Sequence, residues 1–313
     1  MNWVMDPTID VEPWQVEDYR SLPIDEIFER LDDKSIHLDK MTFIAFADNV
    51  DSPEDLADGL LEDSKEDVAS HDQVYLMIFE LWRRLLPEKP SLSIFCDELD
   101  QQIHLCDSGQ VKNIEPIQDA LANLQVILDE NYDEGADPIE AFNCIDDGCA
   151  NNVESFLYDY IAEQIDNGNN SYAIELLDGF SGYMREAKWF DFLRARVLSS
   201  TDPIEANKMM QRLITKAVKD PNFEYNLELL SFLVSVGEKE TFDRLVKISL
   251  PLIQLEEDFQ DLVAISADFF HRLDRESVEN TLQNILNMRE KIPLYKNFDP
   301  KDPQLASFVK VIF

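Results

Sequence analysis

The stretch VESFLYDYIAEQIDNGNNSYAIELLDGFSGYM, residues 153–184, decides the fold of the second half of this chain. Its apolar side chains recur three, four and seven residues apart, which is the spacing of one helix face and not the alternation of a strand. A polar run, NGNNS, separates two such stripes. The stretch therefore predicts two helices joined by a short turn. The first stripe holds Val153, Phe156, Leu157, Tyr160, Ile161 and Ile165, and the second holds Ala173, Leu176, Leu177, Phe180 and Met184.

The same arrangement repeats along the chain to residue 293. Four helix pairs can be drawn at 153–186, 187–221, 222–256 and 257–293, with lengths of 34, 35, 35 and 37 residues. A repeat of this length with two helices per unit is typical of a solenoid, in which each unit packs on its neighbours. The apolar pattern predicts that the second helices begin at Ala173, Ala206, Phe242 and Val278.

These units resemble degenerate tetratricopeptide repeats over about 140 residues. Trp189 stands early in a first helix, Ala173 and Ala206 stand early in second helices, and Asp220-Pro221 marks a boundary between units. The third and fourth units depart from the family pattern, because they lack the alanine that opens the second helix. The resemblance implies a peptide-binding groove lined by the first helices.

The first half of the chain also has helical periodicity, but its spacing is less regular. We expect an all-α fold in which an α-solenoid of tetratricopeptide-like helix pairs follows an irregular acidic helical region. The expected divisions are a tail at 1–13, an acidic helical domain at 14–150, the helical repeat domain at 151–293, and a capping tail at 294–313. The stretch 51–72 is expected to be a partly exposed, linker-like helix. Candidate helices in the first half are 23–31, 37–48, 53–62, 70–86, 91–105, 113–130 and 138–149.

The C-terminal tail contains several prolines, so we expect extended chain there. The outer face of a terminal repeat has no neighbouring repeat and needs a cover. Apolar residues that can supply this cover are Phe308, Val309, Val311, Ile312 and Phe313.

Charge is the strongest global feature of the composition. The chain has 64 acidic and 27 basic residues, for a net charge of −37. Residues 1–150 carry 37 acids and 9 bases, a net −28, and residues 151–313 carry 27 and 18, a net −9. Such a surface repels phosphates, so direct binding of nucleic acid is not expected. The asymmetry indicates that the two halves face different surroundings, although solubility alone also explains a high net charge.

One segment carries a net positive charge, unlike the rest of the chain. Residues 185–219 hold eight bases and four acids, a net +4. Guanidinium groups bind carboxylates bidentately, so this segment could hold an acidic peptide or a chain-end carboxylate. The alternative is that these bases pair with acids of neighbouring repeats or of the N-terminal half. The candidate partner-binding residues are Lys188, Arg194, Arg196, Arg212 and Lys216.

The run DENYDEGADPIE, residues 129–140, can be read in two ways. It places oxygen-bearing side chains at positions 1, 3, 5, 9 and 12 of a calcium loop, but Gly135 comes one place too late for the sharp turn. Alternatively, Asp137 is a helix N-cap, Pro138 the first helical residue and Glu140 an acid in the first turn. The same device recurs at Asp202-Pro203 and Ser52-Pro53, so capping is favoured.

The sequence gives no other chemical signal. The four cysteines and four histidines match no zinc, nucleophile or metalloprotease spacing, and no glycine-rich phosphate loop occurs. Neither a cofactor nor a metal is expected. No apolar run could span a membrane, and the acidic start is unlike a signal peptide, which favours a cytoplasmic protein.

These observations predict a non-enzymatic protein–protein interaction module, such as a scaffold, adaptor or chaperone, that binds a peptide or helix on the solenoid surface. Two alternatives stay open. One is an acidic mimic or inhibitor of a partner with a basic groove, and the other is a metal-binding protein or enzyme that uses carboxylates. The partner expected here is a protein or peptide, and the oligomeric state is not indicated.

Overall fold

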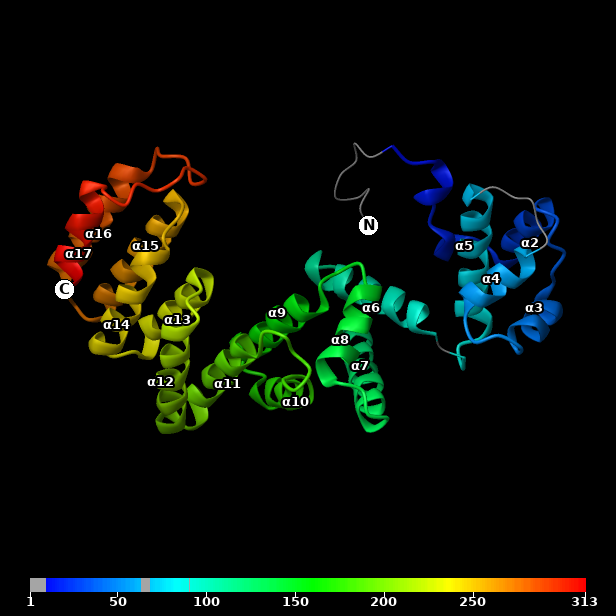
Figure 1. The fold of residues 1–313 in the computed structure, drawn as a ribbon, viewed down its shortest axis with the longest axis horizontal. Coiled ribbons are helices and arrows are strands. Elements are labelled where there is room, and N and C mark those ends of the chain that lie inside the picture. Colours follow the sequence, from blue (N-terminus) through cyan, green and yellow to red (C-terminus); the bar gives the residue numbers. More distant parts are fainter. Residues whose placement is uncertain (1–9, 63–67, 90) are drawn as a thin grey trace. The chain divides into compact units, whose positions relative to one another are not determined.

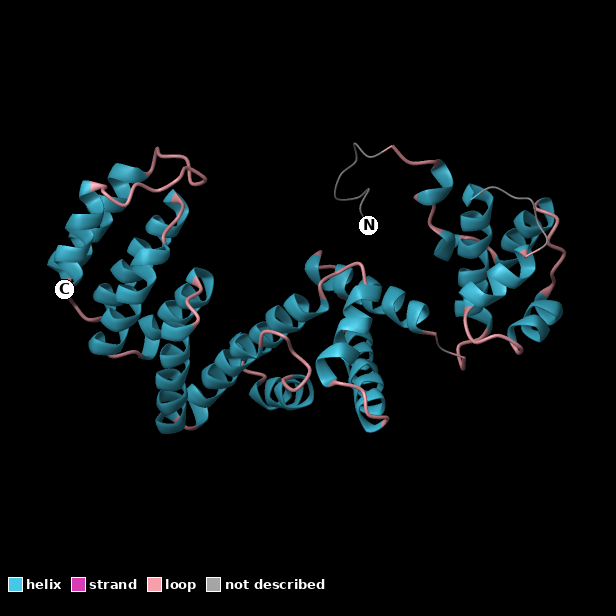
Figure 2. Ribbon diagram, viewed as in Figure 1, coloured by secondary structure: helices cyan, strands magenta, loops and turns pink. Residues whose placement is uncertain are grey.

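The computed structural model describes residues 10–62, 68–89 and 91–313. Within these ranges it contains 16 α-helices and no strand, which confirms the predicted all-α class (Figures 1 and 2). The chain divides into two compact units, Met1–Phe156 and Leu157–Phe313. Most of the predicted 1–13 tail and residues 63–67 of the acidic stretch 51–72 lie outside the described residues.

In the first unit, each of the seven candidate helices is observed within a few residues of its expected bounds. The stretch 51–72 is not the expected linker-like helix, because its helix Pro53–Leu61 buries Leu56, Ala57 and Leu61 in the core. The first four helices share one apolar core around Phe43, Leu81 and Trp82, each fully buried. The next three pack on one another. The helices are α2 (Ile24–Asp33), α3 (Lys40–Ala47), α4 (Pro53–Leu61), α5 (Val68–Leu85), α6 (Leu92–Asp107), α7 (Glu115–Asp133) and α8 (Pro138–Gly148).

A buried carboxylate fastens the N-terminal segment to α5. Glu80 is almost completely buried and pairs with both Arg83 and Arg84. Arg84 also donates hydrogen bonds to the carbonyl oxygens of Tyr19 and Leu22, at 2.8 and 2.6 Å. A buried charge is tolerated only when it is paired, so this cluster holds the chain ahead of α2 in one place.

The helices of the second unit follow one another in pairs, and α11 with α12, α13 with α14, and α15 with α16 pack together (Figure 1). No helix in the described part of the chain is both long and apolar enough to cross a membrane. The helices are α9 (Val153–Asp166, whose first turn falls in the first unit), α10 (Asn170–Phe180), α11 (Ala187–Thr201), α12 (Pro203–Lys219), α13 (Phe223–Val236), α14 (Lys239–Ser249), α15 (Glu256–Arg272), α16 (Glu276–Arg289) and α17 (Pro303–Ile312).

The second helix of each pair starts two or three residues earlier than its apolar pattern predicted. Ala173, Ala206, Phe242 and Val278 are the first inward-facing residues, whereas the helices begin at Asn170, Pro203, Lys239 and Glu276. The first turn lies ahead of the apolar stripe, so the stripe does not mark it. In α12 the start is set by a cap, because the Asp202 side chain accepts a hydrogen bond from the Glu205 backbone nitrogen at 3.1 Å. The helices α10, α14 and α16 have no such side-chain cap.

The C-terminal segment differs from its prediction, because its last part is the helix α17 and not extended chain. Asp302 accepts from the backbone nitrogen of Gln304 at 2.7 Å, and Pro303 follows as the first helical residue. The helix packs on α16, which lies between α15 and α17 along the chain (Figure 1). Phe308 and Ile312 are buried as expected of a cover, but Phe313 is 46% exposed.

Candidate functional site

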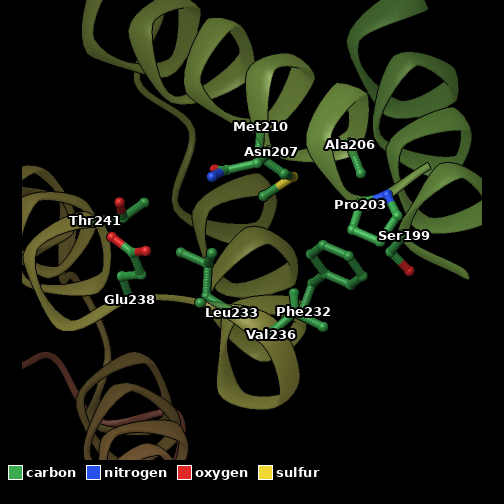
Figure 3. Close-up of a pocket in the computed structure, with 11 residues that line it drawn as sticks. Ser199, Pro203, Ala206, Asn207, Met210, Phe232, Leu233, Val236, Glu238 and Thr241 are labelled. Atoms are coloured by element: carbon green, nitrogen blue, oxygen red, sulfur yellow. The ribbon is translucent and has the colours of Figure 1, made fainter.

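The apolar pocket in Figure 3 lies where four helices of the second unit meet. Its volume is about 260 Å³. Ala206, Met210 and Leu233 are its buried walls, and Phe232 is half-buried beside them. The polar lining residues Asn207, Glu238 and Thr241 come from α12 and from the start of α14. The remaining lining residues are Ser199, Pro203, Val236 and Gly237.

Local sequence signals build this pocket. The cap at Asp202 ends α11 and starts α12 without a linker, so Ser199 and Pro203 are brought to the same edge. Gly237 ends α13, and its backbone nitrogen donates to the Leu233 oxygen at 2.8 Å. A Cβ at Gly237 would come within 2.7 Å of Leu233. Only glycine therefore allows this close turn into α14.

Exposed apolar side chains surround the pocket. Val236, a lining residue, is 53% exposed, and Ile204 on the first turn of α12 is 72% exposed. Helices α12 and α14 are joined across the rim by a hydrogen bond from Gln211 Nε2 to Thr241 Oγ1 at 3.0 Å. The pocket is therefore open to solvent between two helices that are held together.

Three cations stand on the outer side of α12. Lys208, Arg212 and Lys216 have side chains that are 60%, 69% and 64% exposed. Glu205 contacts two of them, at 3.0 Å from Lys208 and at a loose 3.9 Å from Arg212, and Asp191 contacts Lys216 at 2.9 Å. Surface pairs of this kind contribute about 0–1 kcal/mol, so these cations can exchange partners at small cost. We call Lys208, Arg212 and Lys216 the α12 cations.

The predicted cations on α11 have a different setting, because each is drawn to an acid on a neighbouring element. Arg194 pairs with Asp178 of α10 at 2.7 Å, and Arg196 pairs with Asp166 of α9 at 2.5 Å. Their side chains are 33% and 17% exposed. These two arginines connect successive helix pairs, as the alternative interpretation of the basic segment described.

Lys188, at the other end of α11, pairs with an acid of its own helix pair and also contacts a ring of the next pair. Its Nζ lies 3.0 Å from the Asp220 carboxylate and 5.8 Å from the ring centre of Tyr225. Partial burial lowers the pKa of Lys188, but hydrogen bonds to Asp220 and Glu186 outweigh that effect and raise it overall. Lys188 therefore stays charged. Of the five predicted binding residues, only Arg212 and Lys216 lie on α12, the helix that walls the pocket.

The first helices carry a row of aromatic rings that contact one another from helix to helix. Tyr158 on α9 meets Trp189 on α11 with ring centres 5.4 Å apart, and Trp189 meets Tyr225 on α13 at 4.9 Å. Burial, together with the charge of Glu228, raises the pKa of Tyr158. The edge-to-face geometry of these pairs favours packing, so the row is a seam between helix pairs.

The run at residues 129–140 is a helix end and a cap, not a calcium loop. Residues Asp129 to Asp133 belong to α7, and Gly135 turns the chain with φ of 98°. Asp137 then accepts hydrogen bonds from the backbone nitrogens of Ile139 and Glu140 at 2.9 and 3.2 Å, which confirms the capping interpretation. Within residues 10–62, 68–89 and 91–313, no three His, Cys, Asp or Glu side chains are grouped to hold a metal ion.

Comparison with known proteins gives no relative from which a role could be transferred: no family model, curated protein or solved structure matches this chain.

Proposed function

We propose that residues 153–293 form a tetratricopeptide-like solenoid that acts as a non-enzymatic protein–protein interaction module. Two kinds of contact support the solenoid. First helices contact first helices, as α13 does with α11 and α15, and second helices contact second helices, as α12 does with α14. Stacking of this kind leaves an extended surface on which a partner can bind.

The observation that carries the proposal is the pocket between α12 and α14. At about 260 Å³ it falls below the ~300–1,000 Å³ of pockets that enclose a drug-sized molecule. Its size and apolar walls suit one large side chain of a partner. Binding energy at protein interfaces concentrates in such buried anchors. The exposed Val236 and Ile204 extend the apolar surface beyond the pocket.

Charge then selects the partner. The helix α12 carries one acid, Glu205, and four bases, whereas the whole chain has a net charge of −37. Most of this protein repels an acidic partner. The carboxylates of such a partner are therefore attracted most strongly to the basic side of α12. The occupant we propose is an amphipathic segment of another protein, with one large apolar residue for the pocket and acidic residues beside it for the α12 cations.

Peptide display against the full chain tests this function. The selection uses the wild-type protein, an Asn207→Trp variant that places a large ring at the pocket mouth, and Arg212→Glu. An Arg275→Glu variant is the matched control, because Arg275 is an exposed arginine outside the pocket and the α12 cations. We expect peptides that combine acids with a large apolar residue. They should be enriched on the wild type and the control, and lost on both Asn207→Trp and Arg212→Glu.

Other results would contradict the proposal. Enriched basic peptides that are insensitive to Asn207→Trp and Arg212→Glu would favour the acidic-mimic alternative, in which the −28 charge of residues 1–150 does the binding. Peptides that bind all four proteins equally would show that neither the pocket nor the α12 cations form the site.

A further inference from the structure

Two thiols of the first unit lie against each other, apart from the proposed binding surface. Cys96 stands on α6, and Cys149 is the residue that ends α8. Both are free thiols; Cys96 is buried and Cys149 is half-buried. Cys96 Sγ lies 3.7 Å from the carbonyl oxygen of Ile145, and the same oxygen accepts a hydrogen bond from the Cys149 backbone nitrogen at 3.1 Å. Neither thiol has a role in the proposed function.

Two further contacts hold the chain around Cys149 against α6. A Cβ at Gly148 would lie only 3.1 Å from Cys96 Sγ, so the backbone just before Cys149 passes close to the other thiol. On the other side of Cys149, the backbone nitrogen of Ala150 donates to Asp100 Oδ2 at 2.7 Å. Asp100 stands one turn beyond Cys96 on the same helix. The backbone on both sides of Cys149 is therefore held close to the part of α6 that carries Cys96.

The environment makes the two sulfurs unequal. The neighbouring Cys149 thiol lowers the pKa of Cys96, although burial opposes this. The neighbouring Cys96 sulfur, burial and the charge of Asp100 raise the pKa of Cys149. The thiolate is the reactive form of cysteine, so the lowered pKa favours reaction at Cys96, whereas exposure favours Cys149, the less buried of the two. A neighbouring second thiol is the arrangement that resolves an oxidised cysteine.

We propose that Cys96 and Cys149 are a modification site at which a peroxide closes an intramolecular disulfide in the folded protein. The Cys96 thiolate attacks one peroxide oxygen, the O–O bond breaks, and Cys96 becomes a sulfenic acid while the leaving hydroxide takes up a proton. The Cys149 sulfur then attacks the Cys96 sulfur, the S–O bond breaks, and the departing hydroxide takes the Cys149 proton. In sum, two thiols and one hydrogen peroxide yield one disulfide and two waters.

The bridge would join α6 to the chain segment just beyond α8. Cys149 has extended backbone, with φ of −90° and ψ of 153°. The helix does not continue past Cys149, so no next helical turn restricts its side chain. The bond would close a loop that runs from Cys96 to Cys149. Closing such a loop restricts the unfolded chain and therefore raises the stability of the fold. The bond would be reversed by a small thiol reductant.

The test uses the full chain with Cys106→Ser and Cys144→Ser, which leaves only the pair. After treatment with hydrogen peroxide, we expect the two free thiols per chain to disappear and peptide mapping to find Cys96 joined to Cys149. Tm should rise by roughly 5 °C or more, and dithiothreitol should restore the starting value. Adding Cys149→Ser to this background should leave Cys96 as a sulfenic acid that dimedone labels.

The wild-type chain supplies an internal standard, because its exposed Cys144 reports how far the oxidant has acted. The proposal is overturned if Cys96 and Cys149 stay free at a peroxide dose that oxidises Cys144. It is equally overturned if the bond joins two chains, or if it forms with a fall in Tm, since either result would mean that the folded protein does not hold the pair ready to react.

Discussion

The second unit places arginine in two opposite settings. Arg212 on α12 is 69% exposed and lies 3.9 Å from Glu205, whereas Arg289 on α16 is 4% exposed and has two carboxylates. Arg289 Nη2 lies 2.5 Å from Glu256 and Nη1 lies 2.8 Å from Asp302. Arginine is thus a loosely paired surface charge at Arg212 and the centre of a buried ion-pair cluster at Arg289.

The contrast shows what burial does to a charge. Arg289 also stacks over Phe259 and Phe298, with its guanidinium carbon 4.9 and 5.3 Å from the ring centres. Because water is excluded there, the loss of any partner leaves an uncompensated charge. Arg212 stays hydrated whether or not Glu205 is present. Arg289 is therefore expected to affect folding, and Arg212 to affect binding.

Replacing Arg289 with methionine should have the largest effect. Glu256 and Asp302 would be left without their cation, and unfolding free energy should fall by about 3–5 kcal/mol. Urea denaturation measures this, with Arg275→Met as the exposed control that should change stability by less than about 0.5 kcal/mol. Adding Glu256→Gln and Asp302→Asn to Arg289→Met should recover part of the loss. If the triple variant is no more stable than the single one, uncompensated acids are not the cause.

Replacing Asp302 with asparagine should have a smaller, pH-dependent effect. Burial raises the pKa of Asp302, but hydrogen bonds from Arg289 and the Gln304 backbone outweigh it and hold the pKa below its ordinary value. A carboxyl with a lowered folded pKa stabilises above its unfolded pKa of about 3.9, and this stability is lost as the pH falls through the folded pKa.

Asparagine keeps the N-cap acceptor for the Gln304 nitrogen, but its NH2 group replaces the oxygen that accepts from Arg289, so Asp302→Asn removes the charge and that hydrogen bond together. We expect the variant to be less stable than the wild type by about 1–3 kcal/mol near pH 6, and the two stabilities to converge below about pH 4. Denaturation at both pH values tests this. A difference that stays constant down to low pH would show that Asp302 acts through packing and not through its carboxylate.

The comparison also explains which features the sequence could predict. Helix starts could be predicted where a side-chain cap marks them, because the caps at Ser52, Asp137 and Asp202 are local and repeat the same pattern of residues. The same device at Asp302-Pro303 was missed, because prolines in the tail were taken as interruptions rather than as a helix start. Local signals therefore fix the helices, but proline alone does not tell a helix start from extended chain.

The sequence did not predict which residues from different helices contact each other in the fold. Nothing in the sequence pairs Arg194 with Asp178, or distinguishes these connected cations from the freer Arg212. The pocket likewise depends on the close contact of Gly237 with Leu233 and on a wall from α12. Ala206 in that wall lies more than thirty residues before Gly237 in the chain. Such contacts depend on how helix pairs stack, which an apolar period does not specify.

Replacing Arg212 with glutamate should have the smallest effect on stability and a clear effect on binding. Unfolding free energy should change by less than about 0.5 kcal/mol, because the side chain is exposed and its only ion-pair partner within the described residues is 3.9 Å away. Association with an acidic peptide from the selection should slow by about 3–10-fold at low salt, and the difference should shrink at high salt as charges are screened.

Stopped-flow kinetics on Arg212→Glu, Arg275→Glu and the wild type at two salt concentrations measure this, because exposed charges act mainly on the association rate. A slower rate shared by both variants would reflect net charge alone. A slower rate that persists at high salt would mean that Arg212 packs against the partner. A salt-sensitive loss confined to Arg212→Glu is the result that separates a binding charge from the structural charge at Arg289.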